Sequence, residues 1–340
     1  MAKVVTFGEI MLRLETVGYY RFVQSEYYQA LYGGGEANVA VSLANYGIDV
    51  DFVTKLPAHE IGQGAVNSLR RYGVGTDRIV RGGDRVGIYY LEKGASQRAS
   101  KVIYDRAGSS IAMAKVEDFD WEKIFDKAEW FHFTGITPAL GGELPGICEQ
   151  ACKAAKKLGL KISCDLNYRK KLWSREQAKE TMTRLAGYVD VCIANEEDAR
   201  DVFGIEAPAT DIEGGKLSQE GYQEVAGRLA ESFGFETVAI TLRTSMSASD
   251  NRWAAILYDG KEFYFSKSYP IHIVDRVGGG DSFGAGLIYS LLNKMDKQDA
   301  LEFAVAASCL KHTVEGDFNM VTVEEVRKLA QGDGSGRVQR

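Results

Sequence analysis

The residues with most chemical potential are three consecutive glycines, Gly278, Gly279 and Gly280, and the aspartate after them, Asp281. Glycine has no Cβ, so this glycine run lets backbone N–H groups approach a ligand closely. The apolar segment 283–292 is predicted to be a helix, whose N-terminal amides and positive dipole end would face that ligand. A carboxylate beside an anion site suits a reaction that orients and deprotonates a hydroxyl next to a phosphoryl group. The structural alternative is a tight strand-to-helix turn with an N-terminal Asp cap.

Composition limits the classes of protein to which the chain can belong. It has 340 residues, a net charge of −6 and 45% hydrophobic residues, which suffices for one large α/β domain or two average ones. The negative charge argues against a nucleic-acid partner, because phosphate backbones are bound by basic surfaces. No segment has the length and apolarity of a membrane span, and no signal peptide precedes the first strand. Five thinly spread cysteines favour a reducing cytoplasm over a disulfide framework.

The elements that must position these residues follow from the hydrophobic pattern. Short apolar runs alternate with amphipathic segments, which predicts a doubly wound, mostly parallel α/β sheet. Strands are expected at 4–12, 50–53, 87–92, 101–104, 130–134, 161–165, 189–194, 237–241, 254–258 and 262–265. Helices are expected at 37–46, 62–72, 144–158, 175–186, 199–203, 222–233, 283–292, 300–312 and 323–330.

The chain shows no linker between independent domains. Residues 1–330 are therefore expected to form a single domain, followed by a polar, glycine-rich tail, 331–340, that is expected to be disordered. Two β segments, at about 13–32 and 85–106, interrupt the alternation of strands and helices. Together they are expected to form a small sheet that covers one end of the domain, and such a lid suits a reaction that must exclude water.

Three motifs resemble the signatures of the ribokinase-like (PfkB) carbohydrate kinases. Residues 33–38 (GGGEAN), with Gly47 downstream, resemble the N-terminal signature, and residues 275–281 (DRVGGGD) resemble the C-terminal one. Residues 195–198 (NEED) resemble the Asn-x-x-Glu motif. The resemblance covers residues 3–330. It implies a three-layer αβα fold with a mostly parallel central sheet and a small β-sheet lid, and ATP-dependent transfer of a phosphoryl group to a sugar.

Further segments resemble the 2-keto-3-deoxygluconate kinases of this family. Residues 165–173 (DLNYRKKLW) match their Asp-x-Asn-x-Arg-x-x-Leu-Trp segment, and residues 104–106 (YDR) match their Tyr-x-Arg segment. Residues 315–319 (EGDFN) are similar to their late substrate and nucleotide loop. The positions that match the group's substrate contacts are Gly34, Tyr89, Tyr104, Arg106, Arg169, Asp281 and Asp317.

The two arginines in this set suit an acidic sugar. A sugar acid carries a carboxylate, which the planar guanidinium fork of Arg106 or Arg169 can bind with two hydrogen bonds. The alternatives are that each arginine forms a surface ion pair, and that Tyr89 and Tyr104 are ordinary strand residues of the lid.

The resemblance implies that the γ-phosphoryl group of ATP is transferred to O6 of ketodeoxygluconate, with Asp281 as base and the amides of the glycine run as anion hole. A carboxylate at a helix N-terminus is expected to be held ionised, so it is a weak base and proton transfer comes late. Mg²⁺ keeps most of its waters, so Asn195 and Asp198 are expected to act on it through water; their structural alternative is a helix N-cap and a first-turn acid. The implied nucleotide contacts are Asp165, Asn167, Asn195, Thr241, Arg243, Gly278, Gly280 and Asn319. A requirement for a monovalent cation is left open.

The chain departs from the family pattern at three places. Asp198 stands where the Asn-x-x-Glu motif has Glu, and residues 57–62 lack the aspartate of the usual Gly-x-Asp-x-x-Gly stretch. Residues 241–245 (TLRTS) lack the glycines of Thr-Leu-Gly-x-x-Gly, so Arg243 either contacts ATP phosphates or fills the space. No residue needed for transfer is missing from either signature.

Several alternatives stay open from the sequence. A fructokinase or another PfkB sugar kinase is the nearest, and a sugar-binding regulator that lost turnover is a second. A dinucleotide-dependent dehydrogenase is disfavoured, because no Gly-x-Gly-x-x-Gly turn follows the first strand. The protein is expected to be cytoplasmic and to bind a sugar acid and ATP. It is also expected to form a homo-oligomer, a dimer or larger, without a membrane or nucleic-acid partner. The sequence does not choose between the gluconate- and galactonate-derived epimers.

Overall fold

A nine-stranded sheet forms the centre of the computed structural model, which describes residues 3–195, 197–206, 219–334 and 336. Its strands follow the order β14-β13-β12-β11-β10-β9-β1-β4, and β15 pairs with β13 beside this path. The pairs from β4 through β12 are parallel, whereas β13 pairs antiparallel with β12, β14 and β15. The strands are β1 (Lys3–Phe7), β4 (Asp49–Val53), β9 (Trp130–Thr134), β10 (Lys161–Asp165), β11 (Val191–Asn195), β12 (Thr237–Ser245), β13 (Asp250–Tyr258), β14 (Phe263–Phe265) and β15 (Tyr269–His272).

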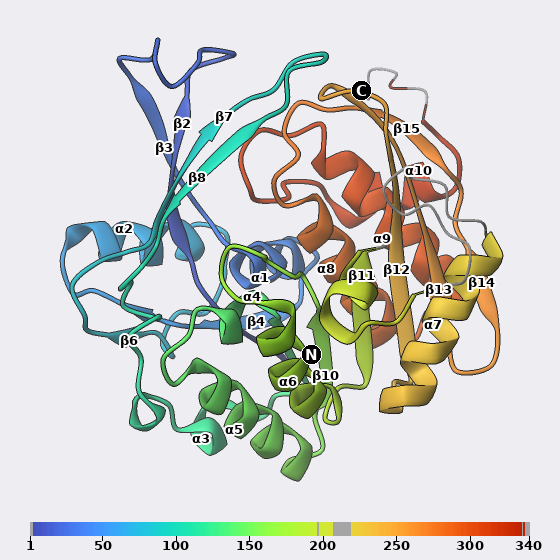
Figure 1. Ribbon diagram of the computed structural model, residues 1–340, viewed down its shortest axis with the longest axis horizontal. Coiled ribbons are helices and arrows are strands. Elements are labelled where there is room, and N and C mark those ends of the chain that lie inside the picture. The colour runs from blue at the N-terminus through green and yellow to red at the C-terminus, as the bar shows by residue number, and fades with distance from the viewer. Residues whose placement is uncertain (1–2, 196, 207–218, 335, 337–340) are drawn as a thin grey trace.

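Helices cover both faces of this sheet, as Figure 1 shows. One apolar core packs the first group against the sheet: α1 (Gly35–Asn45), α2 (Glu60–Arg70), α8 (Gly279–Leu292), α9 (Lys297–Lys311) and α10 (Val323–Ala330). A second core packs the other group: α3 (Trp121–Ile124), α4 (Ile136–Ala139), α5 (Leu144–Lys157), α6 (Arg175–Ala186), the π-helix η2 (Ala199–Phe203) and α7 (Gln219–Phe233). A 3-10 turn, η1 (Val116–Asp118), precedes α3. The predicted three-layer α/β fold is therefore confirmed.

A smaller four-stranded sheet stands beside these layers, with the order β3-β2-β7-β8 (Figure 1). Its strands are β2 (Met11–Thr16), β3 (Tyr28–Gly33), β7 (Ile88–Glu92) and β8 (Lys101–Asp105). We call it the lid sheet. A further pair, β5 (Lys55–Leu56) and β6 (Val80–Arg81), links it to the main layers. Large apolar side chains lie exposed on and around the lid sheet: Val17, Tyr19, Tyr20, Val23, Tyr27, Tyr28, Ile103 and Tyr104.

The predicted strand over residues 4–12 is wrong in its extent. The main sheet keeps only β1, which ends at Phe7, and β2 begins at Met11 in the lid sheet. The chain turns between them at Gly8, where a Cβ would lie 2.0 Å from a carboxylate oxygen of Glu36. The bend therefore requires glycine, and it carries the chain from one sheet to the other.

The strands predicted at 237–241 and 254–258 are longer in the structure, where they form the β12–β13 hairpin. β12 continues to Ser245 and β13 begins at Asp250, so the two strands project beyond the main sheet. Strand β15 and the start of α8 at Gly279 were also not predicted. Of the expected disordered tail, residues 335 and 337–340 lie outside the described residues.

Candidate active site

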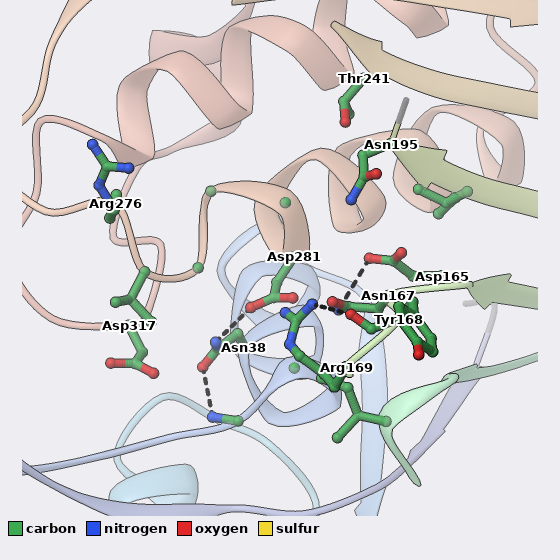
Figure 2. Close-up of a pocket in the computed structure, with 18 of the residues that line it drawn as sticks. Asn38, Asp165, Asn167, Tyr168, Arg169, Asn195, Thr241, Arg276, Asp281 and Asp317 are labelled. Carbon is green, nitrogen blue, oxygen red and sulfur yellow. Dashed lines mark hydrogen bonds between the residues drawn. The ribbon is translucent and has the colours of Figure 1, made fainter. Parts of the chain in front are cut away.

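A cavity of about 490 Å³ lies at the carboxyl ends of the parallel strands, where open α/β sheets bind ligands, and extends to the lid sheet (Figure 2). It gathers residues from elements far apart in the chain. The predicted site residues that line it are Gly34, Tyr89, Tyr104, Arg106, Asp165, Asn167, Arg169, Asn195, Asp198, Thr241, Arg243, Gly278, Gly279, Gly280, Asp281 and Asp317. Asn319 is the predicted residue that does not.

Asn319 is a buried structural residue. Its Nδ2 donates to the Tyr46 hydroxyl at 3.0 Å, and its Oδ1 accepts from Val321 N at 3.3 Å. Both ends of the amide are thereby occupied within the protein. The structure does not bring this side chain to the cavity, and the predicted nucleotide contact of Asn319 stays a prediction.

The glycine run forms the turn into α8. Gly278 has φ of 85°, and a Cβ there would lie 2.1 Å from the Asp317 carbonyl oxygen. A Cβ on Gly279 would lie 2.4 Å from the His312 ring. At Gly280, in contrast, no atom lies within 4 Å of that position. The first two glycines permit close packing of the turn, and the third leaves the helix N-terminus open to the cavity.

Asp281 lies in the first turn of α8, with its carboxylate partly open to the cavity and enclosed by protein elsewhere. Asn38 Nδ2 donates to its Oδ2 at 2.6 Å, and Asn38 Oδ1 accepts from Gly34 N at 3.2 Å (Figure 2). Burial raises the pKa of Asp281 to about 6, while the Asn38 hydrogen bond opposes this shift. Burial thus favours a stronger base than an ordinary aspartate, while the timing of the proton transfer stays a prediction.

Arg169 lies beside the carboxylates of Asp165, Asp198 and Asp281. Its Nη1 donates to the Tyr168 carbonyl at 3.0 Å, and it makes no ion pair with a described residue. Burial is the main cause that raises the pKa of each of the three carboxyl groups, and the charge of Arg169 opposes it in all three. Arg169 is thus a cation with free donors in an acidic part of the cavity.

Arg106 is placed differently. It is 9% exposed, its Nε donates to Glu9 Oε2 at 2.8 Å, and its Nη2 bonds to the same oxygen. The Ser109 hydroxyl donates to the other oxygen of Glu9 at 2.6 Å. The guanidinium also lies 5.5 Å from the centre of the Tyr104 ring. The ion pair that was the alternative for Arg106 is therefore present, but it is buried rather than on the surface.

Asp317 and Tyr89 belong to a buried network centred on Arg13. The Tyr89 hydroxyl lies 2.6 and 2.7 Å from the two Asp317 oxygens, and Arg13 Nη1 donates to Asp317 at 2.7 Å. Arg13 Nη2 also pairs with Glu15 and Asp275. Arg13 is 0% exposed, so a single buried guanidinium joins the lid sheet to the loop before α8 and to the loop after α9.

Asn195 and Asp198 hold the end of β11 in place. Asn195 Oδ1 accepts from the amides of Glu197 and Asp198 at 2.8 and 3.0 Å. The Asp198 oxygens accept from Tyr168 N at 3.0 Å and from Asn195 N at 3.1 Å. Asn195 thus caps the turn that leads into η2, whereas Asp198 stands at the N-cap position of η2 without a side-chain cap hydrogen bond and is not its first-turn acid. The Nδ2 of Asn195 donates to no described residue.

Five residues that line or support the site escaped the sequence reasoning: Glu9, Arg13, Glu36, Asn38 and Arg276. Glu36 is buried, accepts from the Thr134 amide and from the Thr134 and Thr137 hydroxyls, and has its pKa raised to about 7 by burial. Two of the five, Glu36 and Asn38, stand inside the N-terminal signature. The unusual polarity of a helix start that is otherwise apolar was the available signal for them.

Comparison with known proteins assigns this fold and cavity to a family. The sequence profile described as pfkB family carbohydrate kinase matches residues 1–323. The chain belongs to the pfkB carbohydrate kinase family. It is therefore a phosphotransferase, and the resemblance drawn from its motifs is confirmed.

Similar proteins are known from several organisms. A crystal structure from Thermotoga maritima, described as 2-dehydro-3-deoxygluconokinase, is 53% identical with a TM-score of 0.95, and the match covers 98% of this chain and 100% of that one. A Haloferax volcanii protein named 2-dehydro-3-deoxygalactonokinase is 32% identical over 337 residues, which is 98% of each chain. A chain from E. coli, described as a Ribokinase II in complex with ATP and Mg²⁺, shares the fold at 20% identity with a TM-score of 0.81, over 97% and 99% of the two chains.

Among the described residues, no helix combines the length and apolarity needed to cross a membrane. Nor do three or more of their His, Cys, Asp or Glu side chains gather as ligands of a metal ion.

Proposed function

We propose that the protein transfers the γ-phosphoryl group of ATP to O6 of 2-keto-3-deoxygluconate (2-dehydro-3-deoxygluconate). The observation that supports this most is the place of Arg169, which lines the cavity near Asp281 and has no carboxylate partner in the part of the chain that the structure describes. A guanidinium with free donors suits the carboxylate of a sugar acid. The named activity of the Thermotoga maritima relative, at 53% identity, supports the same substrate.

The proton of the acceptor hydroxyl passes to Asp281. Asn38 binds Oδ2 of this carboxylate, so Oδ1 is left to accept the proton. The bond between O6 and the γ-phosphorus then forms, the bond from that phosphorus to the β,γ-bridging oxygen breaks, and ADP leaves. A pKa of about 6 makes Asp281 a stronger base than an ordinary aspartate, while it stays mostly ionised at neutral pH.

Charge that develops on the transferring group is stabilised by the start of α8. The amides that follow Gly278 have no helical partners, and the open position at Gly280 lets the phosphoryl oxygens approach them. The absence of side chains there is what permits this approach.

The cavity also suits ATP and Mg²⁺. Asn195 Nδ2, the Thr241 hydroxyl and Arg243 line its nucleotide side and can hold phosphate oxygens. Asp165 is the carboxylate best suited to the hydrated metal, because the one hydrogen bond that its carboxylate accepts from a described residue is long, 3.5 Å from Asn167 Nδ2. Bound Mg²⁺ supplies positive charge that neutralises the phosphates, and it would also offset the mutual repulsion of Asp165, Asp198 and Asp281.

The galactonate-derived epimer is a second candidate substrate. It is supported by the Haloferax volcanii relative named 2-dehydro-3-deoxygalactonokinase, which is 32% identical over almost the whole chain. The two sugar acids differ at one hydroxyl and share the carboxylate and the acceptor O6. Arg169 and Asp281 therefore serve both, and discrimination falls to side chains around the remaining hydroxyls.

The test is a coupled assay of ADP release with both epimers, gluconate, fructose and ribose as acceptors. We expect the highest kcat/KM for 2-keto-3-deoxygluconate. Faster turnover of fructose or ribose would instead support the fructokinase alternative. Loss of all turnover with retained sugar binding would support the regulator.

We further propose that the lid sheet closes over the bound sugar, and that its exposed aromatic face pairs between subunits of a homo-oligomer. The exposed tyrosines of this sheet support the second part. Sedimentation equilibrium tests it, with Tyr28→Ser expected to shift the oligomer toward monomer. A wild-type monomer at micromolar concentration would refute this part. The cytoplasmic location and the monovalent cation stay predictions.

A further inference from the structure

Two arginines face the nucleotide side of the cavity without a carboxylate partner in the described part of the chain. Arg243 lies exposed on β12, and Arg276 lies half-buried just before the glycine run. Burial is the main cause that lowers the pKa of Arg276, and the like charge of Arg243 lowers it further, so the two guanidinium groups that line this cavity repel each other. In a protein with a net charge of −6, this pair of unneutralised cations is unexpected unless an anion joins them.

The β12–β13 hairpin explains why Arg243 faces the cavity. Arg243 is paired with Trp253 in the antiparallel register, and paired residues share a face of a sheet. Thr241, two residues earlier, lies on the same face, and all three side chains line the cavity. Arg252, next to Trp253, falls on the opposite face and does not line it. The hairpin thus offers an arginine where related kinases offer glycine amides.

Arg276 is held from the side away from the cavity. Its Nη2 donates to the Ala248 carbonyl at 3.0 Å, at the tip of the same hairpin. Its Nε and Nη1 have no hydrogen-bond partner among the described residues, and they remain as donors. Figure 2 shows Arg276 across the glycine turn from Asn195 and Thr241. One hydrogen bond therefore fixes the guanidinium at the edge of the anion hole while leaving donors free.

The other charged groups around the pair do not neutralise it. Asp275 is adjacent in sequence, but its carboxylate is committed to Arg13 and to the amides of Val277 and Gly316. His312 also lines the cavity, and its pKa is lowered to about 4, mainly by burial, so it stays uncharged at neutral pH. The positive charge at this end of the cavity is thus available to a ligand.

We propose that Arg276 acts with Arg243 as a clamp on the polyphosphate of the nucleotide. Each planar fork can donate two hydrogen bonds to phosphate oxygens, and the bound anion relieves the repulsion between the forks. This inference rests on the proposed ATP-dependent activity and adds Arg276 as a nucleotide-binding residue. It also gives the missing glycines a functional replacement by side chains.

The test is calorimetric titration of the full-length protein with ADP and with AMP, each with Mg²⁺ and without sugar. For Arg276→Ala we expect about 10- to 100-fold weaker ADP binding, since hydrogen bonds between charged groups contribute about 1.5–3 kcal/mol. The same variant should bind AMP with an affinity within about threefold of the wild-type affinity, because AMP lacks the β-phosphate and so loses no hydrogen bond of this kind. In steady state, the KM for ATP should rise while the KM for the sugar acid stays unchanged.

Matched variants make the result specific. Arg252→Ala removes a guanidinium from the opposite face of the same hairpin and should leave ADP binding unchanged. Arg276→Lys should restore part of the affinity, because it keeps the charge but not the fork. Without ligand, the Arg243→Ala protein should have a melting temperature no lower than that of the wild type, because the repulsion between Arg243 and Arg276 is removed.

Equal weakening of ADP and AMP by Arg276→Ala, or an unchanged affinity for ADP, would overturn the clamp. Failure of the proposed function would look different. The substrate panel would then name another acceptor, while the difference between ADP and AMP, measured without sugar, would persist.

Discussion

At the sugar end of the cavity Arg106 is paired with Glu9 and Arg13 with Asp317, whereas at the nucleotide end Arg243 and Arg276 have no carboxylate partner among the described residues. The first arrangement is complete before any ligand binds. Its charges are buried and mutually satisfied, so it fixes the shape of the sugar site. The second arrangement is completed only by an anion. The difference teaches that arginines lining one cavity can have unlike surroundings, and it supports our proposal that Arg169, rather than Arg106, binds the sugar carboxylate.

The largest expected effect comes from replacing Asp281, the proposed base between the two ends of the cavity. Asp281→Asn keeps the shape but removes the base, so kcat should fall by about 10³-fold, within the usual range for general-base catalysis. ADP binding and the sugar KM should change little. Stopped-flow measurement of the transfer step gives the comparison, and unchanged phosphorylation would remove Asp281 from the mechanism.

Loss of Arg13 tests whether the sugar end is prearranged. Arg13→Met leaves Asp275 and Asp317 buried without the cation that pairs with them, while Glu15 keeps Lys93, so the unfolding free energy should fall by about 3–5 kcal/mol. Urea denaturation measures it. The control is Lys157→Met, which breaks an exposed pair with Glu122 and should cost less than about 1 kcal/mol. Similar losses of unfolding free energy from both substitutions would show that the Arg13 network stabilises the protein no more than an exposed ion pair does.

Replacing Arg169 and replacing Arg106 should have different effects on kinetics and on stability. Arg169→Met should lower kcat/KM for the sugar acid by about 10- to 100-fold, because a charged hydrogen-bonding partner of the carboxylate is lost. It should leave stability nearly unchanged, since no ion pair of a described residue is broken. Arg106→Met should instead lower the melting temperature by leaving Glu9 unpaired. The reverse pattern would assign the carboxylate to Arg106.

The smallest effect is a pH dependence. The pKa of Asp281 is raised to about 6, so protonation below that pH removes the base. At saturating MgATP, kcat/KM for the sugar acid should fall about tenfold per pH unit below pH 6 and be level above it. The residual activity of Asp281→Asn should lack this acidic limb. A fall in kcat/KM of the wild type that begins only near pH 4 would show that burial does not raise the pKa of Asp281.

The sequence predicted what depends on local pattern. Helix α6 occupies the predicted 175–186, where Ser174 and Gln177 form a capping box, and the glycine run opens α8 as a positive-φ turn requires. It did not predict which charges neutralise one another. Arg106 meets Glu9 from 97 positions away, and Arg13 meets Asp317 from 304. Such pairs depend on how the two sheets pack, and no local spacing records that.

The hairpin of β12 and β13 shows a related limit. The missing glycines at 241–245 were visible in the sequence, but their replacement by a projecting hairpin was not. Strand propensity alone does not tell where a pair of strands leaves the main sheet, because that depends on the pairing of β13 with β15. Arg276 escaped notice for the same reason, since its anchor, Ala248, lies at the hairpin tip.

The central claim is that one cavity holds the sugar carboxylate against Arg169 and the acceptor O6 against Asp281. A crystal structure with 2-keto-3-deoxygluconate and ADP tests it most directly. We predict the carboxylate within hydrogen-bond distance of the Arg169 guanidinium, O6 within that distance of Asp281 Oδ1, and the Arg106–Glu9 pair intact. A carboxylate bound to Arg106 with Glu9 displaced, or O6 turned away from Asp281, would contradict the account.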